Sequence, residues 1–318
     1  MRNAIGLLVI ALICALHASA FAQAWPTKTV RIVVTLGPGS GTDIVGRMLA
    51  EKLAAPLGQP VIVENRPGAQ TTVGTAYVAK ADDGHTLLVT SSSYTVAPFI
   101  YPSLPYDTVR DLAAVAPLAN LPTVLVVPAS KGFRTVHDLV AAAKARPGSI
   151  NFAAAGASTQ LNAERFRRSA NFQAQHIPFK GAPDALNEVI AGRVDFYFSP
   201  VAPALAHIRD GKLVALAVGS AKRAAILPEL PTTIEAGFPD SDYNFWVGLF
   251  APARTPREIV SRLHGEASAA FQSAEMRERL SRVGAEPMVM TQAQFDAHIR
   301  DELRMNEQLV KAAGISAN

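Results

Sequence analysis

Residues 29–43, TVRIVVTLGPGSGTD, combine a run of β-branched side chains with a glycine-rich loop. Residues 29–36 have the composition of a buried strand, and the glycines that follow interrupt it. Thr42 then suits the N-cap of a helix whose apolar residues recur at helical spacing until Gly58. Residues 60–64 (PVIVE) supply the next strand. This order predicts a βαβ unit and an α/β fold.

The alternation of strands and helices continues along the chain. The capping-box spacing of Thr135 and Asp138 predicts a helix over residues 135–146. The same spacing recurs at Thr255 and Glu258, where Pro256 suits the first helical position, and at Thr291 and Gln294. Further strands are predicted over residues 87–90, 113–118, 123–128, 150–154, 193–198, 213–219 and 245–251.

Two segments lack the period of a helix or a strand. Residues 98–107 and 227–239 are punctuated by prolines, which indicates connecting segments. The simplest topology has two α/β lobes joined by a two-strand hinge. Residues 25–124 are the first part of lobe I, 125–246 are lobe II, and 247–318 complete lobe I. Such a fold binds ligands in the cleft at the carboxyl ends of its strands.

Residues 1–24 have the features of an export signal. Arg2 precedes an apolar run, and the small residues around Ala22 and Ala24 fit a cleavage site after Ala24. An uncleaved anchor is the alternative, but the run is short for a bilayer. Cys14 lies within this segment, so the mature chain is expected to have no cysteine and no disulfide.

Composition argues against several classes of function. The net charge is +4 and the basic residues are interspersed with acidic ones, so no polyanion-binding surface is predicted. Trp25 and Trp246 are isolated, which argues against an aromatic platform for nucleic acid. The histidines of the mature chain lack paired metal spacing and are expected at the surface or as capping residues. We predict no metal, no cofactor and no enzymatic activity.

Two loops of small residues, the first of them rich in glycine, are the candidate binding elements. Each follows a predicted strand and opens a helix, so its backbone N–H groups and the helix dipole converge where an anion could bind. Facing one another across a cleft, they suit a dicarboxylate better than a cation. Ser91 and Ser92 could add hydroxyls from a third strand. The loop residues are Gly39, Ser40, Gly41, Thr42 and Asp43 in the first half, and Gly156, Ala157, Ser158 and Thr159 in the second.

Each of these features has a structural alternative. The first loop could be only a sharp turn, and Asp43 and Arg47 have the spacing of a helix-surface ion pair. The serines at 91–93 could form a solvated turn. Asp195 could be a buried hydrogen-bond acceptor or a cleft residue.

The chain resembles the Bug-type periplasmic solute receptors, the extracytoplasmic components of tripartite tricarboxylate transporters. Many short runs in the same order carry the resemblance, which covers nearly the whole mature chain. They are residues 58–69 (GQPVIVENRPGA), 83–88 (DGHTLL), 104–107 (LPYD), 143–148 (AKARPG), 176–181 (HIPFKG), 211–213, 217–218, 227–232 (LPELPT), 235–237, 251–252 and 255–256.

The resemblance implies a two-lobed periplasmic-binding-protein fold of type II. It implies a periplasmic receptor that captures a small carboxylate, such as a di- or tricarboxylate, an amino acid or an aromatic acid, for a membrane permease. Loop amides, hydroxyls and waters would hold the ligand, which adds Gly181 and Ser199 to the candidate site. We expect a monomer that binds no nucleic acid.

This sequence departs from the family pattern at four places. The first loop reads LGPGSGTD rather than the usual Phe-x-Pro-Gly-Gly before its aspartate. In the second loop, Ala157 and Gln160 replace a serine and a histidine. Phe179 replaces a tyrosine, and Ser199 replaces a frequent acidic residue. These changes suggest a less polar or bulkier acid.

Two other functions stay open on the sequence. A periplasmic sensor that signals to a membrane histidine kinase would use the same ligand-closed form. A serine hydrolase would pair Ser40, Ser92 or Ser158 with a histidine, although the chain has no Gly-x-Ser-x-Gly motif.

Overall fold

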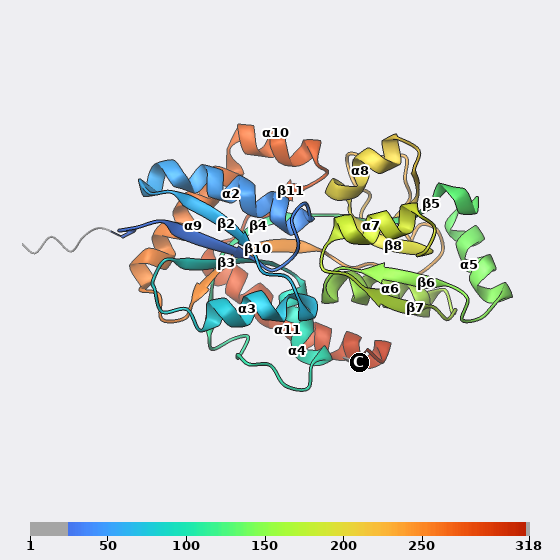
Figure 1. The fold of residues 1–318 in the computed structure, drawn as a ribbon, viewed down its shortest axis with the longest axis horizontal. Coiled ribbons are helices and arrows are strands. Elements are labelled where there is room, and N and C mark those ends of the chain that lie inside the picture. Colours follow the sequence, from blue (N-terminus) through green and yellow to red (C-terminus); the bar gives the residue numbers. More distant parts are fainter. Residues whose placement is uncertain (1–24, 316–318) are drawn as a thin grey trace, which may run out of the picture.

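The computed structural model describes residues 25–315 of the 318-residue chain. They form two α/β lobes that lie side by side along the long axis, each built on its own sheet (Figure 1). The predicted export signal, Cys14 and the cleavage after Ala24 lie outside the described residues. Within residues 25–315, no helix combines the length and the hydropathy that crossing a membrane requires.

Lobe I contains a six-stranded sheet in the order β11-β4-β10-β3-β1-β2. Strands β1, β2 and β3 are parallel, and β10 runs antiparallel between β3 and β4. Strand β10 is the predicted strand 245–251, and it returns the chain to this sheet. The strands are β1 (Val30–Val34), β2 (Val61–Asn65), β3 (Thr86–Ser91), β4 (Leu112–Asn120), β10 (Trp246–Pro252) and β11 (Glu286–Pro287).

Helices cover both faces of this sheet because its central strands are apolar on both sides. In β1, Ile32 and Val34 pack with the first group of helices, whereas Val33 packs with the second. Burying each such side chain contributes about 1.5–3 kcal/mol. The first group is α2 (Gly41–Leu57), α9 (Arg257–Gln272) and α10 (Ala274–Arg282); the second is α3 (Thr72–Ala79), α4 (Ser93–Ile100) and α11 (Gln292–Ala313).

Lobe II repeats this plan on a five-stranded sheet in the order β7-β6-β8-β5-β9. Helices α5 and α6 pack on one face, and α7 and α8 on the other. The strands are β5 (Thr123–Pro128), β6 (Asn151–Ala154), β7 (Gln175–Pro178), β8 (Phe196–Pro200) and β9 (Leu213–Val218). The helices are α5 (Val136–Ala145), α6 (Ala157–Ser169), α7 (Ala182–Ile190) and α8 (Val201–Arg209).

The chain crosses between the two lobes twice. The chain enters lobe II after β4 and returns after β9, and in both lobes the arriving strand inserts antiparallel between two others. This arrangement directs the carboxyl ends of β1, β3, β6 and β8 toward the boundary between the lobes. The loops that carry the candidate residues therefore meet there.

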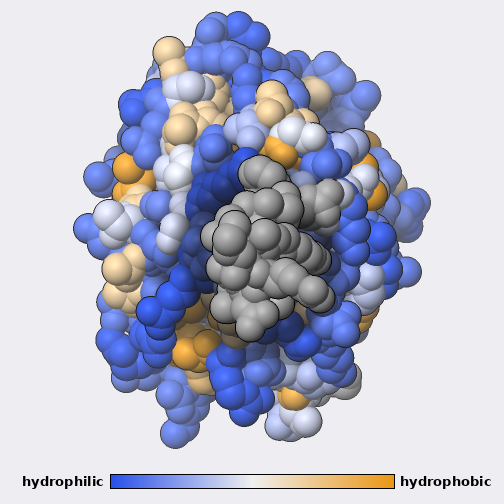
Figure 2. Space-filling view, turned by 90° about the vertical axis from the view of Figure 1, so that its left-hand side faces the viewer, coloured by the Kyte–Doolittle hydropathy of each residue, from blue (hydrophilic) through white to orange (hydrophobic). Residues whose placement is uncertain are grey.

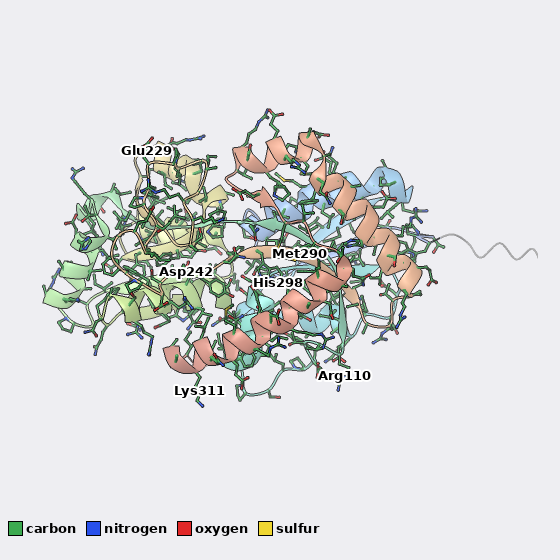
Figure 3. All side chains as sticks on the ribbon, turned by 180° about the vertical axis from the view of Figure 1, so that it is seen from behind. Arg110, Glu229, Asp242, Met290, His298 and Lys311 are labelled. Atoms are coloured by element: carbon green, nitrogen blue, oxygen red, sulfur yellow. The ribbon has the colours of Figure 1, made fainter. Side chains whose placement is uncertain are left out.

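Helix α11 adds a third connection between the lobes. It runs along the back of lobe I, and its end near Lys311 reaches lobe II (Figure 3). Val310 and Ala313 share an apolar cluster with Leu161 of α6 and with residues of α4. Farther back along the helix, the buried Glu302 accepts hydrogen bonds from Trp246 Nε1 and Thr95 Oγ1, both at 2.8 Å. These bonds fix α11 to β10 and to α4.

Two predicted helix starts are wrong. The N-cap of α2 is Ser40 rather than Thr42, because Ser40 has extended backbone and its Oγ accepts from Asp43 N–H at 3.3 Å. Helix α9 begins at Arg257, and its N-cap position is occupied by Pro256, which makes no side-chain hydrogen bond. Thr255 therefore does not form the predicted capping box. The boxes at Thr135 and Thr291 are confirmed.

The connection predicted from residue 98 begins later in the structure. Pro98 lies inside α4, whose apolar residues Val96, Ala97 and Ile100 are buried. Packing of this helix against α6 and α11 outweighs the poor helix propensity of proline. The serines at 91–93 consequently close strand β3 and open α4 rather than form a solvated turn.

The end of lobe I that carries the N-terminal segment is mostly hydrophilic, with hydrophobic residues in small scattered groups (Figure 2). Ile62 on the edge strand β2 is one of the exposed large hydrophobic residues of this lobe. Isolated apolar residues of this kind are normal at a protein surface.

Candidate functional site

A cavity of about 520 Å³ lies at the boundary between the lobes. Its volume is in the range of small-molecule sites. Lobe I contributes one loop and two side chains, lobe II contributes β6, the start of α6 and β7, and the segment after α11 closes one side. The lining residues are Leu36, Gly68, Ala69, Gln70, Thr71 and Tyr101; Ala154, Gly156, Gln160, Glu164, His176, Pro178, Phe179 and Lys180; and Gly314 and Ile315.

The lobe I wall is a loop with unusual backbone geometry. Residues 68–71 all have positive φ, at 137° for Gly68, 41° for Ala69, 53° for Gln70 and 88° for Thr71. Non-glycine residues in this region cost on the order of 1 kcal/mol or more, and such strain gathers at functional sites. Thr71 is 1 % exposed and its Oγ1 has no protein partner. The loop therefore holds polar groups at the cavity in a conformation that only surrounding structure sustains.

Two carboxamides meet across the cavity. Gln70 Nε2 in lobe I donates to Gln160 Oε1 on α6 of lobe II at 2.7 Å. Gln160 is buried, and Gln70 Oε1 is also buried without a protein partner. This pair joins the two lobes and leaves one acceptor available in the cavity.

The second candidate loop, residues 156–159, reaches the cavity through Gly156. This residue has φ of 96°, and a Cβ there would lie 2.7 Å from Ser93 Oγ and 3.6 Å from a Leu36 methyl group. The absence of a side chain lets lobe I approach the N-terminus of α6. Ser158 is fully buried; its N–H donates to Ser93 Oγ at 3.1 Å, and the two hydroxyls are 2.9 Å apart.

The other residues of this loop serve the local structure. Thr159 Oγ1 accepts from Ala155 N–H at 3.0 Å and lies 3.1 Å from Gly156 O, to which it can donate. Ala157 is buried in the apolar cluster that α6 shares with α4 and α11. The loop thus joins the lobes while its one glycine, Gly156, lines the cavity.

The first glycine-rich loop is braced within lobe I. The Asp43 carboxylate accepts from Gly39 N–H at 2.9 Å, Asn65 Nδ2 at 2.8 Å and Arg47 Nε at 3.0 Å. The Asp43–Arg47 ion pair that the spacing suggests is therefore present. Ser40 caps α2, and Thr42 is buried with its Oγ1 unpaired.

The same loop touches lobe II through its backbone. Gly37 N–H donates to Lys180 O at 2.9 Å, and a Cβ on Gly181 would lie 3.2 Å from Gly37 Cα. A Cβ on Gly41 would lie 2.7 Å from a Leu121 methyl group and 3.2 Å from Pro200 Cβ. Small residues at these positions allow the two backbones to come together.

The remaining predicted residues have structural partners or lie elsewhere. Ser91 Oγ accepts from Ser93 N–H at 3.3 Å, Ser92 is buried with an unpaired Oγ, and Ser199 Oγ donates to Pro200 O at 2.9 Å. Asp195 is a buried acceptor, bonded to Asn151 N–H at 2.7 Å and paired with Lys131.

Asp195 lies beside Asn151, at the end of β6 that is away from the cavity. Asn151 begins β6, whereas Ala154 at the other end of that strand lines the cavity. Of the predicted site residues, all within residues 25–315, Gly156 alone is among those lining the cavity. Direct ligand contact by the others stays a prediction.

The lobe II wall of the cavity carries both acidic and basic side chains. Burial lowers the pKa of His176 to about 4, so its ring is uncharged at neutral pH, and its Nε2 has no protein partner. Burial raises the pKa of Glu164, opposed by Arg167, whose guanidinium lies 2.6 Å from the carboxylate. Lys180 adds an ammonium group. Within residues 25–315, no cluster of three or more histidine, cysteine or acidic side chains could hold a metal ion.

The sequence reasoning missed most of the cavity wall. His176 was expected at the surface or as a capping residue, yet it lines the cavity and stacks on Phe152 at 5.3 Å between ring centroids. The runs 58–69 and 176–181 carry the family resemblance, but of their residues only Gly181 is among the predicted site residues. Their role follows from the sheet order, which places β7 beside β6, and from the left-handed loop at 68–71.

Comparison with known proteins bears on this cleft. The tripartite tricarboxylate transporter family receptor (TctC) matches residues 45–315. BugT of Bordetella pertussis is 35% identical over 298 residues, which cover 92% of this chain and 91% of BugT. A protein from the tcbD–tcbE intergenic region of Pseudomonas sp. strain P51 is 38% identical over 82% of this chain and 79% of its own length.

Solved structures agree with the family match. R. palustris Rpa4515 with adipate has a TM-score of 0.89 at 30% identity, covering 92% of this chain and 99% of its own. The periplasmic binding protein BugD has a TM-score of 0.88 at 28% identity, covering 92% and 100%. MatC of Rhodopseudomonas palustris with bound malate has a TM-score of 0.85 at 29% identity, covering 90% and 100%.

These matches confirm the two-lobed periplasmic-binding-protein fold and the Bug-type resemblance. The family match spans both lobes and the cavity between them. The chain belongs to the receptor family of the tripartite tricarboxylate transporters, TctC.

Proposed function

We propose that this chain is a periplasmic receptor that captures a small carboxylate between its lobes and delivers it to the permease of a tripartite tricarboxylate-type transporter. It acts as a monomer and as a binding protein rather than an enzyme. The observation that carries the proposal is the cavity, to which both lobes contribute and on which the start of α6 and Lys180 converge. Helix N-termini and ammonium groups favour anions.

The relatives support the same class of ligand. Rpa4515 is described with adipate and MatC with malate, and both share the fold at close to 30% identity. Binding requires only that the ligand stabilise the closed arrangement over the open one. The bonds from Gly37 to Lys180 and from Gln70 to Gln160 are contacts that closure would form.

A thermal-shift screen of the full chain, expressed with its own N-terminal segment, tests this proposal. The panel contains aliphatic mono-, di- and tricarboxylates, amino acids and aromatic acids, with matched amines as controls. A ligand at about a hundred times its Kd adds roughly 2.7 kcal/mol, or about 5–10 °C for a chain of this size. A selective shift with one class of acid supports the receptor function; no shift with any acid contradicts it.

Delivery to a permease needs its own test. Deleting the gene for this chain should abolish uptake of the identified acid in whole cells, and restoring it should rescue uptake. Unchanged uptake together with loss of a transcriptional response to the acid would instead favour the sensory role.

A further inference from the structure

Three residues that line the cavity carry buried polar atoms that the protein itself leaves unpaired. Gln70 Oε1, Thr71 Oγ1 and His176 Nε2 are buried atoms without a protein partner, and all three residues line the cavity. Leaving such a group unpaired costs about 1–3 kcal/mol, so buried polar atoms are nearly always satisfied. Three of them around one cavity indicate that a ligand, or water that a ligand displaces, completes their bonds.

These three groups are uncharged. The Gln70 oxygen is an acceptor, the Thr71 hydroxyl both donates and accepts, and the His176 ring is neutral at pH 7 and offers either role at Nε2. A hydroxyl or carboxamide on a ligand also combines donor and acceptor. A carboxylate only accepts, so it would leave the Gln70 oxygen unpaired and place negative charge against it.

The charges of the cavity point the same way. Among the described lining residues, Glu164 supplies a carboxyl group and Lys180 an ammonium group, and Arg167 forms an ion pair with Glu164. The ammonium of Lys180 is left to balance a ligand anion, together with the start of α6. A second carboxylate would meet Glu164 rather than a second cation, and desolvating an unpaired charge is costly.

We propose that the ligand is a monocarboxylate that carries an uncharged hydrogen-bonding group, a hydroxyl or carboxamide, read by Gln70 together with Thr71 and His176. Gln160 is a positioning residue, because its Oε1 fixes one Gln70 N–H and orients the free oxygen. This inference rests on the proposed carboxylate receptor and makes its ligand class specific. The apolar walls formed by Leu36 and Phe179 accommodate the carbon skeleton between the two polar ends.

Matched series of acids test the proposal by calorimetry on the full chain. Each series keeps one carboxylate and the skeleton while the far end is methyl, carboxamide or carboxylate. Suitable probes are butyrate, succinamate and succinate; hexanoate, adipamate and adipate; and p-toluate, 4-carbamoylbenzoate and terephthalate. In the series that binds best, we expect the carboxamide acid to bind at least tenfold more tightly than both partners.

A variant then assigns this preference to Gln70. Gln70→Gly suits the left-handed backbone at this position (φ 53°) and removes the side chain with its carboxamide. It should abolish the tenfold preference for carboxamide over methyl. Asn171→Gly is the control, because Asn171 has φ of 51° in an exposed turn of lobe II and should retain the preference.

The outcomes separate the two proposals. A diacid that binds as tightly as the carboxamide acid, or a preference that survives Gln70→Gly, overturns this inference and leaves the carboxylate receptor standing. A thermal midpoint within 2–3 °C of the unmodified protein shows that the variant is folded. No binding of any acid overturns both proposals.

Discussion

The two candidate loops have the same strand–loop–helix order but make different contacts in the folded molecule. The first, between β1 and α2, is held by Asp43, which bonds to Gly39, Asn65 and Arg47 within lobe I. The second, between β6 and α6, exposes Gly156 to the cavity and bonds through Ser158 to Ser93 of the other lobe. The same strand–loop–helix motif thus has different partners at its two places in the fold.

What distinguishes the loops is the element that faces each of them. The first loop contacts the backbone of lobe II at Lys180 and Gly181, which leaves little room between the two backbone segments. The second loop faces the left-handed segment 68–71 and an open volume of about 520 Å³. We therefore propose bracing for the first loop and ligand contact for the second, and the predictions below test that division.

The largest effect is expected from Gly156→Ala. A Cβ at this position would lie 2.7 Å from Ser93 Oγ, and φ of 96° is strained for alanine. The lobes would be held apart, so the ligand-induced thermal shift should disappear. Gly237→Ala is the matched control, because Gly237 has φ of 92° with open space around it. Loss of binding in both variants would contradict the account.

Asp43→Ala should cost stability rather than binding. It leaves Gly39 N–H and the Asn65 amide without their buried acceptor, at a cost on the order of 3 kcal/mol. The thermal midpoint should fall by roughly 6–10 °C. Arg47→Ala removes only the half-exposed partner and should cost less than about 1 kcal/mol.

Ligand affinity measured on folded Asp43→Ala protein checks the division between the loops. A Kd within about threefold of the unmodified protein agrees with a bracing role. An unchanged midpoint together with lost binding would place Asp43 in the ligand site instead.

Acid should destabilise the protein through His176. Its pKa is about 4 in the fold against an ordinary 6.5, so the unfolded chain binds more protons between these values. Stability from this group is full above pH 6.5 and is lost as the pH falls toward 4, by on the order of 1–2 kcal/mol between pH 7 and 5. The raised pKa of Glu164 acts in the opposite sense. In His176→Gln, the thermal midpoint should depend less on pH over this range. A pH dependence unchanged from the unmodified protein would refute the assignment.

The smallest effect concerns the bond between Gln70 and Gln160. A single hydrogen bond contributes about 0.5–1.5 kcal/mol, so Gln160→Ala should weaken ligand binding about two- to tenfold. In a double-mutant cycle with Gln70→Gly, the two losses should be less than additive because they remove the same contact. Strict additivity in calorimetric Kd values would mean that the residues act independently.

Local signals in the sequence predicted the elements of the fold well. The β-branched run ending at Leu36, the glycine at 58 and the boxes at Thr135 and Thr291 each act within a few residues, so their geometry follows from local chemistry. The N-cap of α2 was misplaced by two residues because Ser40 and Thr42 have similar propensities. The extended backbone of Ser40 and the hydrogen bond from Asp43 N–H to its Oγ decide between them.

The site was harder to predict because its residues come together through tertiary structure. His176 lies on β7, a four-residue strand whose position depends on pairing with β6. Gln70 and Gln160 are 90 positions apart and meet only when the lobes do. The positive φ values at 69–71 belong to residues that rarely adopt them, so no local pattern announces the loop.

Hydrogen–deuterium exchange with and without the best-binding acid tests the central claim most directly. The account predicts that the acid protects the amides of residues 68–71, the start of α6 from Gly156, and residues 176–180. Amides around Asp43 should change little. Protection confined to residues 39–43, or absent from 68–71 and 176–180 while the acid is bound, would contradict the assignment of the cavity.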